Sequence, residues 1–258
     1  MPAPVNPLKL ALANKQVQVG CWVGLANSYA AEIMGTAGFD WLLVDGEHAP
    51  NDLRSIMGQL QVIDPSPSHA VVRVPVGDVA LIKQVLEVGA QSVLVPMVES
   101  AEQAQEMVRA VQYPPRGTRG VGAALARSSG FDAIENYATT ADDQMCLILQ
   151  IENRNGLAAL DDILKLDHID AIFVGPADLA ADLGYLGQAG HPEVEAIIAE
   201  TLAKILASGK AAGILTTDLE AAKRYIDLGA TFVGTGVDVL LFAKAARDLG
   251  RKAQELKG

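Results

Sequence analysis

The stretch CLILQIE at residues 146–152 is a short apolar run that ends in an acid. A second run, AIFVGPAD at residues 171–178, follows the same pattern and also ends in an acid. Continuous apolar runs of this length are typical of strands that are buried on both faces of a parallel sheet. If the two runs are neighbouring parallel strands, Glu152 and Asp178 emerge side by side at one rim of the sheet.

Two acids at one rim have two interpretations. Carboxylates are the hard oxygen ligands that commonly hold a divalent cation. Alternatively, each acid stabilises the start of the helix that follows its strand, because Asp and Glu favour helix N-termini. The spacing of Glu152 and Asp178 alone does not separate a metal site from two helix starts.

The composition predicts a globular protein with a sizeable core, because half of the 258 residues are hydrophobic. The net charge of −11 argues against a nucleic-acid-binding surface, which needs a basic stripe. No apolar stretch approaches the roughly 20 residues that span a bilayer, and no signal-peptide pattern begins the chain, so we expect a cytoplasmic protein without membrane contacts. Cys21 and Cys146 lie inside apolar runs and are expected to be reduced core residues.

Eight apolar runs with helical segments between them predict the fold. The runs lie at residues 17–25, 41–47, 70–76, 92–98, 146–152, 171–177, 211–216 and 231–236. Apolar positions at helical spacing predict helices at 100–112, 192–208 and 218–228. Eight strand–helix units in about 250 residues indicate α/β architecture with a single (β/α)₈ TIM barrel domain. A doubly wound sheet is disfavoured because the first run lacks a glycine-rich phosphate turn.

One interval between the runs is much longer than the others. Residues 113–145 separate the fourth and fifth runs and begin with YPPRGTRGVG. We expect an insertion of this length to be a functional loop. It lacks the ending of a nucleotide-binding P-loop, but Arg116 and Arg119 would be available to an anion.

In a TIM barrel, the residues at the carboxyl ends of the strands are the site candidates. Asp45, Glu47 and His48 follow the second run, and Arg73 lies inside the third. His48 is either a catalytic base or a hydrogen-bonded structural residue, whereas Arg73 either meets an anionic ligand or balances a core acid. The other candidates for lining the pocket are Trp22, Gln150, Gly175, Pro176, Ala177 and Leu215. The histidines expected at the surface are His69, His168 and His191.

The positions of the lysines discriminate between two ways of forming a carbanion. A Schiff-base mechanism needs a buried lysine near a strand end, where desolvation depresses the pKa of its amine. The lysines lie on predicted helices, at the termini or, for Lys210, at the amino end of a strand. Two carboxylates, an arginine and a histidine instead fit metal-stabilised enolate formation from a 2-oxo acid.

Several segments of the chain resemble the HpcH/HpaI aldolase family, and the resemblance runs from about residue 8 to residue 250. The segment that first carries it is GFDWLLVDGEHAP at residues 38–50. The other matching segments are VVR at 71–73, LVPMV at 94–98, YPPRGTRGVG at 113–122, QIE at 150–152 and VGPADL at 174–179. The resemblance implies a class II pyruvate aldolase on a (β/α)₈ barrel.

The resemblance also implies a role for each rim residue. Glu152 and Asp178 would bind a divalent ion such as Mg²⁺, Mn²⁺, Co²⁺ or Zn²⁺. His48 would be the base, and Arg73 would stabilise developing negative charge. The residues implied to contact the substrate are Gln150, Ala177 and Asp178. Family members carry an Asp that raises the basicity of the histidine; Glu87 stands at the matching position, and Asp45 is a competing partner for His48.

The expected reaction is reversible retro-aldol cleavage of 4-hydroxy-2-oxoheptanedioate to pyruvate and succinate semialdehyde. The expected partners are therefore small 2-oxo acids and aldehydes. One alternative is an aldolase for 2-dehydro-3-deoxyglucarate or a related 2-keto-3-deoxy sugar acid, and another is a barrel that only binds 2-oxo acids. The resemblance further implies a homohexamer, a trimer of dimers, with the C-terminal helix at about 239–256 in a subunit contact.

Overall fold

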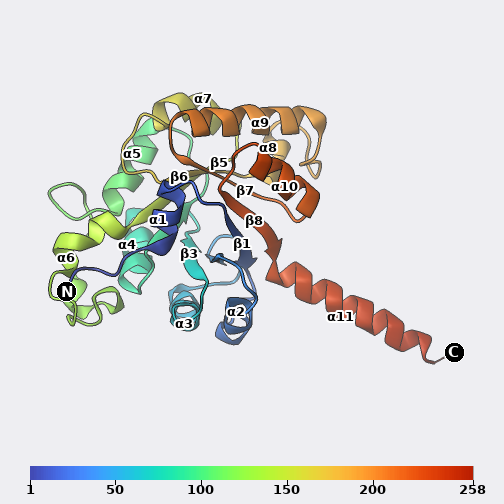
Figure 1. Ribbon diagram of the computed structural model, residues 1–258, viewed down its shortest axis with the longest axis horizontal. Coiled ribbons are helices and arrows are strands. Elements are labelled where there is room, and N and C mark those ends of the chain that lie inside the picture. Colours follow the sequence, from blue (N-terminus) through green and yellow to red (C-terminus); the bar gives the residue numbers. More distant parts are fainter. Residues whose placement is uncertain (258) are drawn as a thin grey trace.

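The computed structural model describes residues 1–257 and shows eight parallel strands that close into a barrel (Figure 1). Each strand pairs with its neighbours in chain order, and β1 completes the barrel by pairing with β8. The strands are β1 (Gln18–Val23), β2 (Trp41–Asp45), β3 (His69–Arg73), β4 (Ser92–Val95), β5 (Cys146–Ile151), β6 (Ala171–Val174), β7 (Ala211–Leu215) and β8 (Phe232–Val237). The predicted TIM barrel is confirmed.

Helices alternate with the strands and cover the outside of the barrel. The α-helices are α1 (Pro7–Ala13), α2 (Ser28–Gly35), α3 (Leu53–Ile63), α4 (Val79–Glu87), α5 (Ala101–Ala110), α6 (Tyr137–Thr140), α7 (Arg154–Ile163), α8 (Pro176–Asp182), α9 (Pro192–Ala207), α10 (Leu219–Asp227) and α11 (Asp238–Glu255). The short 3₁₀ helices are η1 (Ala123–Leu125), η2 (Arg127–Ser129) and η3 (Ala141–Gln144).

Each predicted apolar run corresponds to one strand, and the three predicted helices correspond to α5, α9 and α10. The first seven runs extend too far at their carboxyl ends, whereas the eighth ends one residue before β8 does. The run at 70–76, for example, continues three residues past the end of β3 at Arg73. Apolar residues continue into the rim loops beyond the last ladder hydrogen bond, so hydrophobicity alone overestimates strand length.

The interior of the barrel is filled with aromatic rings. Trp41 stacks on Phe232 with ring centroids 4.1 Å apart, and Phe173 meets Phe232 edge to face. Gly20 makes room for this packing, since a Cβ there would lie 2.0 Å from the Trp41 ring. A second apolar layer lies between the strands and the helices. The rim therefore stands on a close-packed base.

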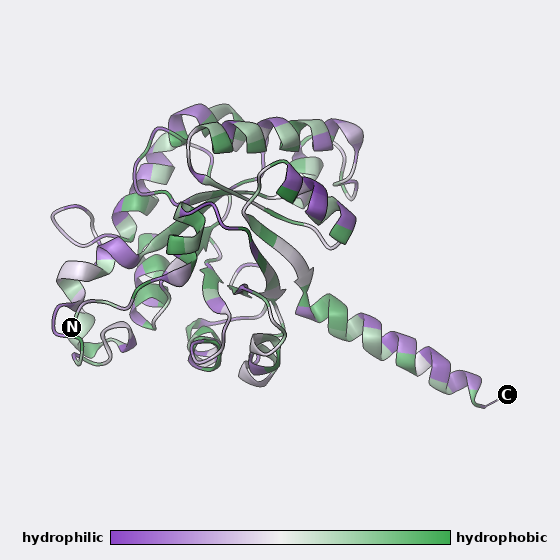
Figure 2. Cartoon of the chain, viewed as in Figure 1, coloured by the Kyte–Doolittle hydropathy of each residue, from purple (hydrophilic) through white to green (hydrophobic). Residues whose placement is uncertain are grey.

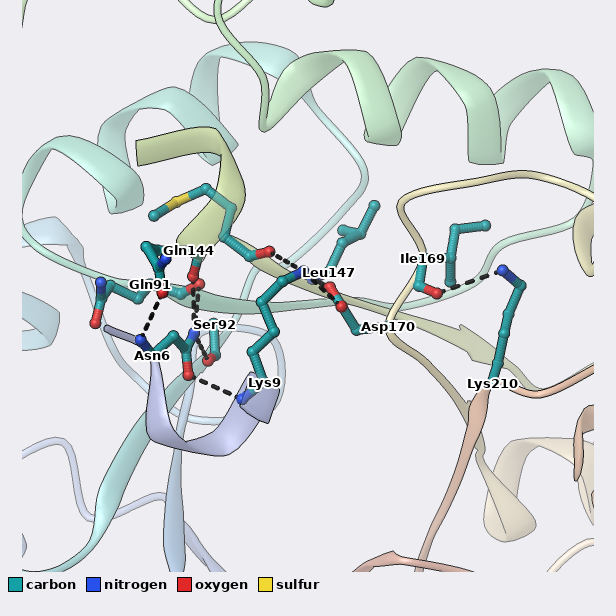
Figure 3. A network of polar contacts seen from close by, with 10 residues as sticks. Asn6, Lys9, Gln91, Ser92, Gln144, Leu147, Ile169, Asp170 and Lys210 are labelled. Atoms are coloured by element: carbon teal, nitrogen blue, oxygen red, sulfur yellow. Dashed lines mark hydrogen bonds and ion pairs between the residues drawn. The ribbon is translucent and has the colours of Figure 1, made fainter. Parts of the chain in front are cut away.

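Helix α1 covers the lower end of the barrel, opposite the carboxyl ends of the strands. Asn6 donates from Nδ2 to the Ser92 hydroxyl at 3.0 Å (Figure 3). Lys9 forms an ion pair with Asp170 at 2.6 Å, and Asp170 also accepts a hydrogen bond from the Leu147 N–H. These contacts tie α1 to the starts of β4, β5 and β6.

The long segment 113–145 also lies at this lower end. It follows α5, which runs back from the rim and therefore delivers the chain to the amino ends of the strands. Arg116 pairs with Asp142 at 3.0 Å, while Arg119 is fully buried with its guanidinium 4.4 Å from the Tyr113 ring centroid. The anion site expected at Arg116 and Arg119 is thus not formed, and the segment lies away from its own chain's rim.

Helix α11 projects away from the barrel, and its last turns lie far from the N-terminus (Figure 1). Its first turns are apolar and exposed at Leu240, Leu241 and Phe242, and they appear green in Figure 2. Among residues 1–257, no helix is both long and apolar enough to cross a membrane. In a single chain, α11 therefore leaves an apolar surface without a covering element.

Two sequence expectations about core residues have different outcomes. Cys21 and Cys146 are free and buried, as predicted. His69, expected at the surface, instead lies in β3 with its Nε2 3.3 Å from the Ser92 hydroxyl. Burial lowers the pKa of His69 to about 4, so the ring is neutral in the folded protein near pH 7.

The depressed pKa of His69 predicts a loss of stability in mild acid. The ordinary pKa of histidine is 6.5. Between pH 6.5 and about pH 4, the unfolded chain therefore binds a proton at His69 that the folded chain does not bind. Stability contributed by the neutral ring is thus present above pH 6.5 and lost as the pH falls through this window, by on the order of 3 kcal/mol. Urea unfolding from neutral pH to about pH 4 should show a shallower decline in His69→Gln than in the parent protein.

The matched control is His168→Asn, at an exposed histidine. It should keep the parent's pH dependence. Equal slopes in the parent and His69→Gln would contradict the burial argument.

Candidate active site

A cavity of about 390 Å³ opens at the carboxyl ends of the strands. It brings together residues from β1, β2, β3, β5, β6, β7 and β8 and from the loops that follow several of them. The predicted site residues that line it are Trp22, Asp45, His48, Arg73, Gln150, Gly175, Pro176, Ala177, Asp178 and Leu215. The barrel thus assembles most of the predicted candidates in one place.

Arg73 lies at the end of β3 and is paired with two acids. Its Nε and Nη2 donate to the two carboxylate oxygens of Asp45 at 2.8 and 2.6 Å. Its Nη1 lies 2.8 Å from Glu47 Oε2, as an ion pair without hydrogen-bond geometry. The guanidinium carbon also lies 5.9 Å from the centroid of the Trp22 ring. Arg73 therefore balances buried acids and also lines the cavity.

Asp45 holds both the arginine and the following turn. One of its carboxylate oxygens accepts hydrogen bonds from the N–H groups of Glu47 and His48 at 3.0 and 3.3 Å. Burial alone would raise the pKa of Asp45, but the hydrogen bonds and charge of Arg73 outweigh it and hold the pKa below its ordinary value. Asp45 is therefore ionised near neutral pH.

His48 is the most open member of the set, with 64% of its side chain exposed. Its nearest carboxylate is Glu47, whose Oε2 lies 3.8 Å from His48 Nε2. Burial raises the pKa of Glu47 despite the nearby charges of Arg73 and His48. The sequence alone assigns Glu47 no role, and its place between Asp45 and His48 in the rim turn is the available signal.

The expected Glu87–His48 pair is not formed within one chain. Glu87 ends α4, which runs from the rim to the lower end of the barrel, whereas His48 lies at the rim. Glu87 Oε1 instead lies 3.5 Å from Arg119 Nη2. Of the two proposed partners, Asp45 is the one near His48, and it contacts the backbone N–H of His48 rather than its ring.

Glu152 is buried at the rim and is held by neighbouring donors. Its Oε1 accepts a hydrogen bond from the Met97 N–H at 2.8 Å, and its Oε2 contacts the Gln150 side-chain amide. Burial raises the pKa of Glu152, and the charges of Asp178 and Glu47 add to this rise, while its hydrogen bonds oppose it. A buried carboxylate near other carboxylates is the environment that a bound cation would relieve.

The donor set at Glu152 and Asp178 fits a hard divalent ion. Asp178 lies in the first turn of α8 and lines the cavity beside Gln150, whose Oε1 is buried without a hydrogen-bond partner. Two carboxylates with a free amide oxygen and room for water suit Mg²⁺-like ions, which keep several water ligands. No cluster of three or more His, Cys, Asp or Glu side chains suited to a metal occurs among residues 1–257.

Gly175, a predicted pocket residue, lines the cavity and also packs closely against Glu152. In the structure, a Cβ at residue 175 would lie 2.4 Å from Glu152 Oε2 and 2.8 Å from Glu152 Cβ. Gly175 is required so that the start of α8 can pack against the Glu152 side chain.

The sequence of the chain is similar to those of known aldolases. The HpcH/HpaI aldolase/citrate lyase family matches residues 18–245. A hydroxypyruvate/pyruvate aldolase from Roseobacter denitrificans is 54% identical over 252 residues, which cover 98% of each chain. A 4-hydroxy-2-oxo-heptane-1,7-dioate aldolase from Escherichia coli is 51% identical over 247 residues, covering 96% of this chain and 94% of the relative.

A solved structure agrees with these matches. The crystal structure of an HpcH/HpaI aldolase/citrate lyase family protein from Burkholderia cenocepacia aligns with a TM-score of 0.92 at 37% identity, over 98% of this chain and all of the other. The barrel and its rim cavity therefore define an aldolase, a carbon–carbon lyase. The chain belongs to the HpcH/HpaI aldolase/citrate lyase family.

The packing of Gly175 against Glu152 yields a prediction about metal affinity. In Gly175→Ala, the new Cβ displaces the Glu152 carboxylate, so if Glu152 is a metal ligand, the Mn²⁺ affinity measured by calorimetry should fall about tenfold or more. Gly58→Ala in α3 is the matched control, since its Cβ would meet only the Ser28 Cβ at 3.8 Å. Unchanged Mn²⁺ affinity in Gly175→Ala would show that Glu152 does not bind the ion.

Proposed function

We propose that the protein is a class II pyruvate aldolase that reversibly cleaves a 4-hydroxy-2-oxo acid into pyruvate and an aldehyde. The observation that carries this proposal is the rim cavity that gathers His48, Arg73, Gln150 and Asp178 beside Glu152. These groups can supply a base, a fixed positive charge and oxygen ligands. The family assignment supports the same chemistry.

Glu152 and Asp178 are the proposed ligands of a divalent cation, Mg²⁺, Mn²⁺, Co²⁺ or Zn²⁺. Divalent-metal dependence is general in the family, and the buried Glu152 carboxylate and the unpartnered Gln150 oxygen support it here. When bound, such an ion supplies Lewis-acid polarisation of the substrate's carboxylate and 2-oxo oxygens. The Gln150 amide would orient the 2-oxo acid at the same point.

Side chains of the protein carry out the proton transfer and stabilise the developing charge. His48 is open to the cavity and takes the proton of the C4 hydroxyl, directly or through a water. The C3–C4 bond then breaks, giving the aldehyde and the pyruvate enolate, and a proton added at C3 gives pyruvate. Arg73 stabilises the enolate charge, and it is held ready for this by Asp45 and Glu47.

Two substrates fit the proposal. One is 4-hydroxy-2-oxoheptanedioate, which would release succinate semialdehyde and matches the name of the E. coli relative. The other is 2-dehydro-3-deoxyglucarate or a related sugar acid. Both substrates contain the pyruvate half, so the metal ligands and Arg73 do not distinguish them. Only residues that contact the aldehyde half of the substrate can distinguish the two.

Replacing Arg73 tests its proposed role. In Arg73→Ala, the cleavage rate should fall about 10²- to 10³-fold because the enolate loses its fixed positive charge. The affinity for Mn²⁺ should change much less, because the proposed ligands remain. Cleavage kinetics and calorimetry measure the two effects, and thermal unfolding checks that the variant folds. Unchanged turnover would contradict the role of Arg73.

Removal of metal tests whether the protein is a metal-dependent aldolase. A chelator should abolish pyruvate formation in the parent protein, and added divalent metal should restore it. Pyruvate formation that persists in chelator would contradict the metal dependence. No pyruvate formation under any metal would instead favour a barrel that only binds 2-oxo acids.

We further propose that the protein assembles as a homohexamer, a trimer of dimers, through α11. The exposed apolar side chains at the start of this helix support a subunit contact, and Phe242 is 66% exposed in the single chain. Within one chain, Glu87 and His48 lie at opposite ends of the barrel. Only the Glu87 of a second subunit could therefore contact His48.

The apolar start of α11 predicts the effect of a charge there. Phe242→Glu should convert the hexamer to smaller species in light scattering, because a carboxylate would be buried without a partner. Lys252→Glu, in the polar last turns of the same helix, is the control and should remain assembled. A monomeric parent protein would overturn the proposed assembly.

A further inference from the structure

The loop between β4 and α5 contains a backbone conformation that non-glycine residues seldom adopt. It spans residues 96–100, and Met97 within it has a φ of 53°. This left-handed region is unfavourable for a residue with a Cβ, because the Cβ approaches the following carbonyl oxygen. Such conformations persist only where the surrounding structure holds them, and they are concentrated at functional sites. Contacts from neighbouring elements must therefore hold Met97 in place.

The left-handed conformation directs the Met97 N–H at a proposed metal ligand. This N–H donates to Glu152 Oε1 at 2.8 Å, and Glu152 is only 2% exposed. The next residue, Val98, is fixed separately, because its N–H donates to the Gln150 carbonyl at 3.1 Å. With Val98 fixed, a return of Met97 to negative φ would turn its N–H away from Glu152. The position of the Glu152 carboxylate therefore depends on the conformation of Met97.

The side chain of Gln103, in α5, bridges this loop. Its Oε1 accepts a hydrogen bond from the Glu99 N–H at 2.9 Å, and its Nε2 donates to the Met97 carbonyl at 3.3 Å. One planar amide thus joins the peptide groups on the two sides of Val98. The reverse orientation would place donor against donor and acceptor against acceptor, so the loop accepts the amide in one orientation. These two contacts hold the peptide group that follows Met97.

The place of Gln103 in its helix shows that this bridge replaces an ordinary cap. Ser100 caps α5 by accepting a hydrogen bond from the Gln103 N–H at 3.1 Å. In a capping box, a Gln at this third helical position bonds back to the N–H of the capping residue itself. The Gln103 amide instead reaches past Ser100 to Glu99 and Met97. It therefore organises the rim loop in addition to the helix end.

We propose that Gln103 is a positioning residue for the metal site: it keeps Met97 left-handed, so that the Met97 N–H holds the Glu152 carboxylate in place for a divalent ion. This inference rests on the proposed function and deepens it. Gln103 does not line the catalytic cavity and acts only through the loop. Groups that orient metal ligands in this way typically contribute about 10- to 100-fold to metal affinity.

Gln103→Leu tests the bridge, because it removes both contacts with little change in size. Met97 should then leave the left-handed region in most molecules, and the Mn²⁺ affinity measured by calorimetry should fall about tenfold. In the metal-free protein, hydrogen exchange of the peptide that covers residues 96–99 should become faster. Gln105→Leu, the same change at an exposed position of α5, is the matched control and should alter neither measurement. Thermal unfolding checks that both variants fold.

A second substitution tests whether Gln103 acts through the conformation of Met97. Glycine adopts positive and negative φ about equally, so Met97→Gly keeps the N–H and depends little on the bridge. Adding Gln103→Leu to Met97→Gly should therefore lower the Mn²⁺ affinity only about twofold. A merely structural role for Gln103 would give the same loss with methionine and with glycine at position 97. Equal losses in the two backgrounds would overturn the proposed mechanism.

Gln103→Glu provides the test if the leucine variant does not fold. It keeps an acceptor for the Glu99 N–H but sets a carboxylate oxygen against the Met97 carbonyl. An acid in the first turn favours a helix, so the thermal stability should be retained. The Mn²⁺ affinity should nevertheless fall, although the added negative charge by itself attracts a cation. An affinity equal to or above that of the parent protein would contradict the role of Gln103.

The parent protein separates this inference from the proposed function. A parent that binds no Mn²⁺ would defeat the proposed metal site, and the inference with it. If the parent binds Mn²⁺ and Gln103→Leu leaves the affinity unchanged, the inference alone is overturned. Unchanged hydrogen exchange at residues 96–99 in the metal-free variant would overturn it as well, because the bridge would then not hold the loop.

Discussion

The rim of this barrel depends on the buried pair between Arg73 and Asp45. The two residues are direct partners in the ladder between β3 and β2, so the closure of the sheet places them side by side. Two hydrogen bonds join them, and both side chains are almost fully buried. Removing one partner of such a pair typically costs about 3–5 kcal/mol, because the other charge is left buried alone.

This pair organises one half of the site and packing organises the other. Asp45 also accepts hydrogen bonds from the turn that carries His48, so one carboxylate positions both the arginine and the histidine. Across the cavity, Glu152 is held by the Met97 N–H and by the close approach of Gly175. The two halves are rigid because they stand on an interior filled by Trp41, Phe232 and their neighbours.

The sequence predicted the strands well because burial on both faces produces continuous apolar runs, which are a local signal. It also predicted which residues lie at the rim, since each parallel strand begins at the lower end of the barrel and ends at the rim. The place of residues 113–145 was recoverable too, because an α-to-β connection lies at the lower end of a barrel. The partners of Arg119 and Glu87 were not recoverable, since they meet only after β3, β4 and the long segment have folded together.

The sequence by itself determined the eight-unit barrel and the identity of the chemical groups at its rim, because strand periodicity and chain direction are properties of neighbouring residues. Only the tertiary structure decided which charges pair. It joined Arg73 to Asp45 and Glu47 and separated Glu87 from His48. These pairings depend on barrel closure and on helix packing, which bring together residues that are distant in the chain.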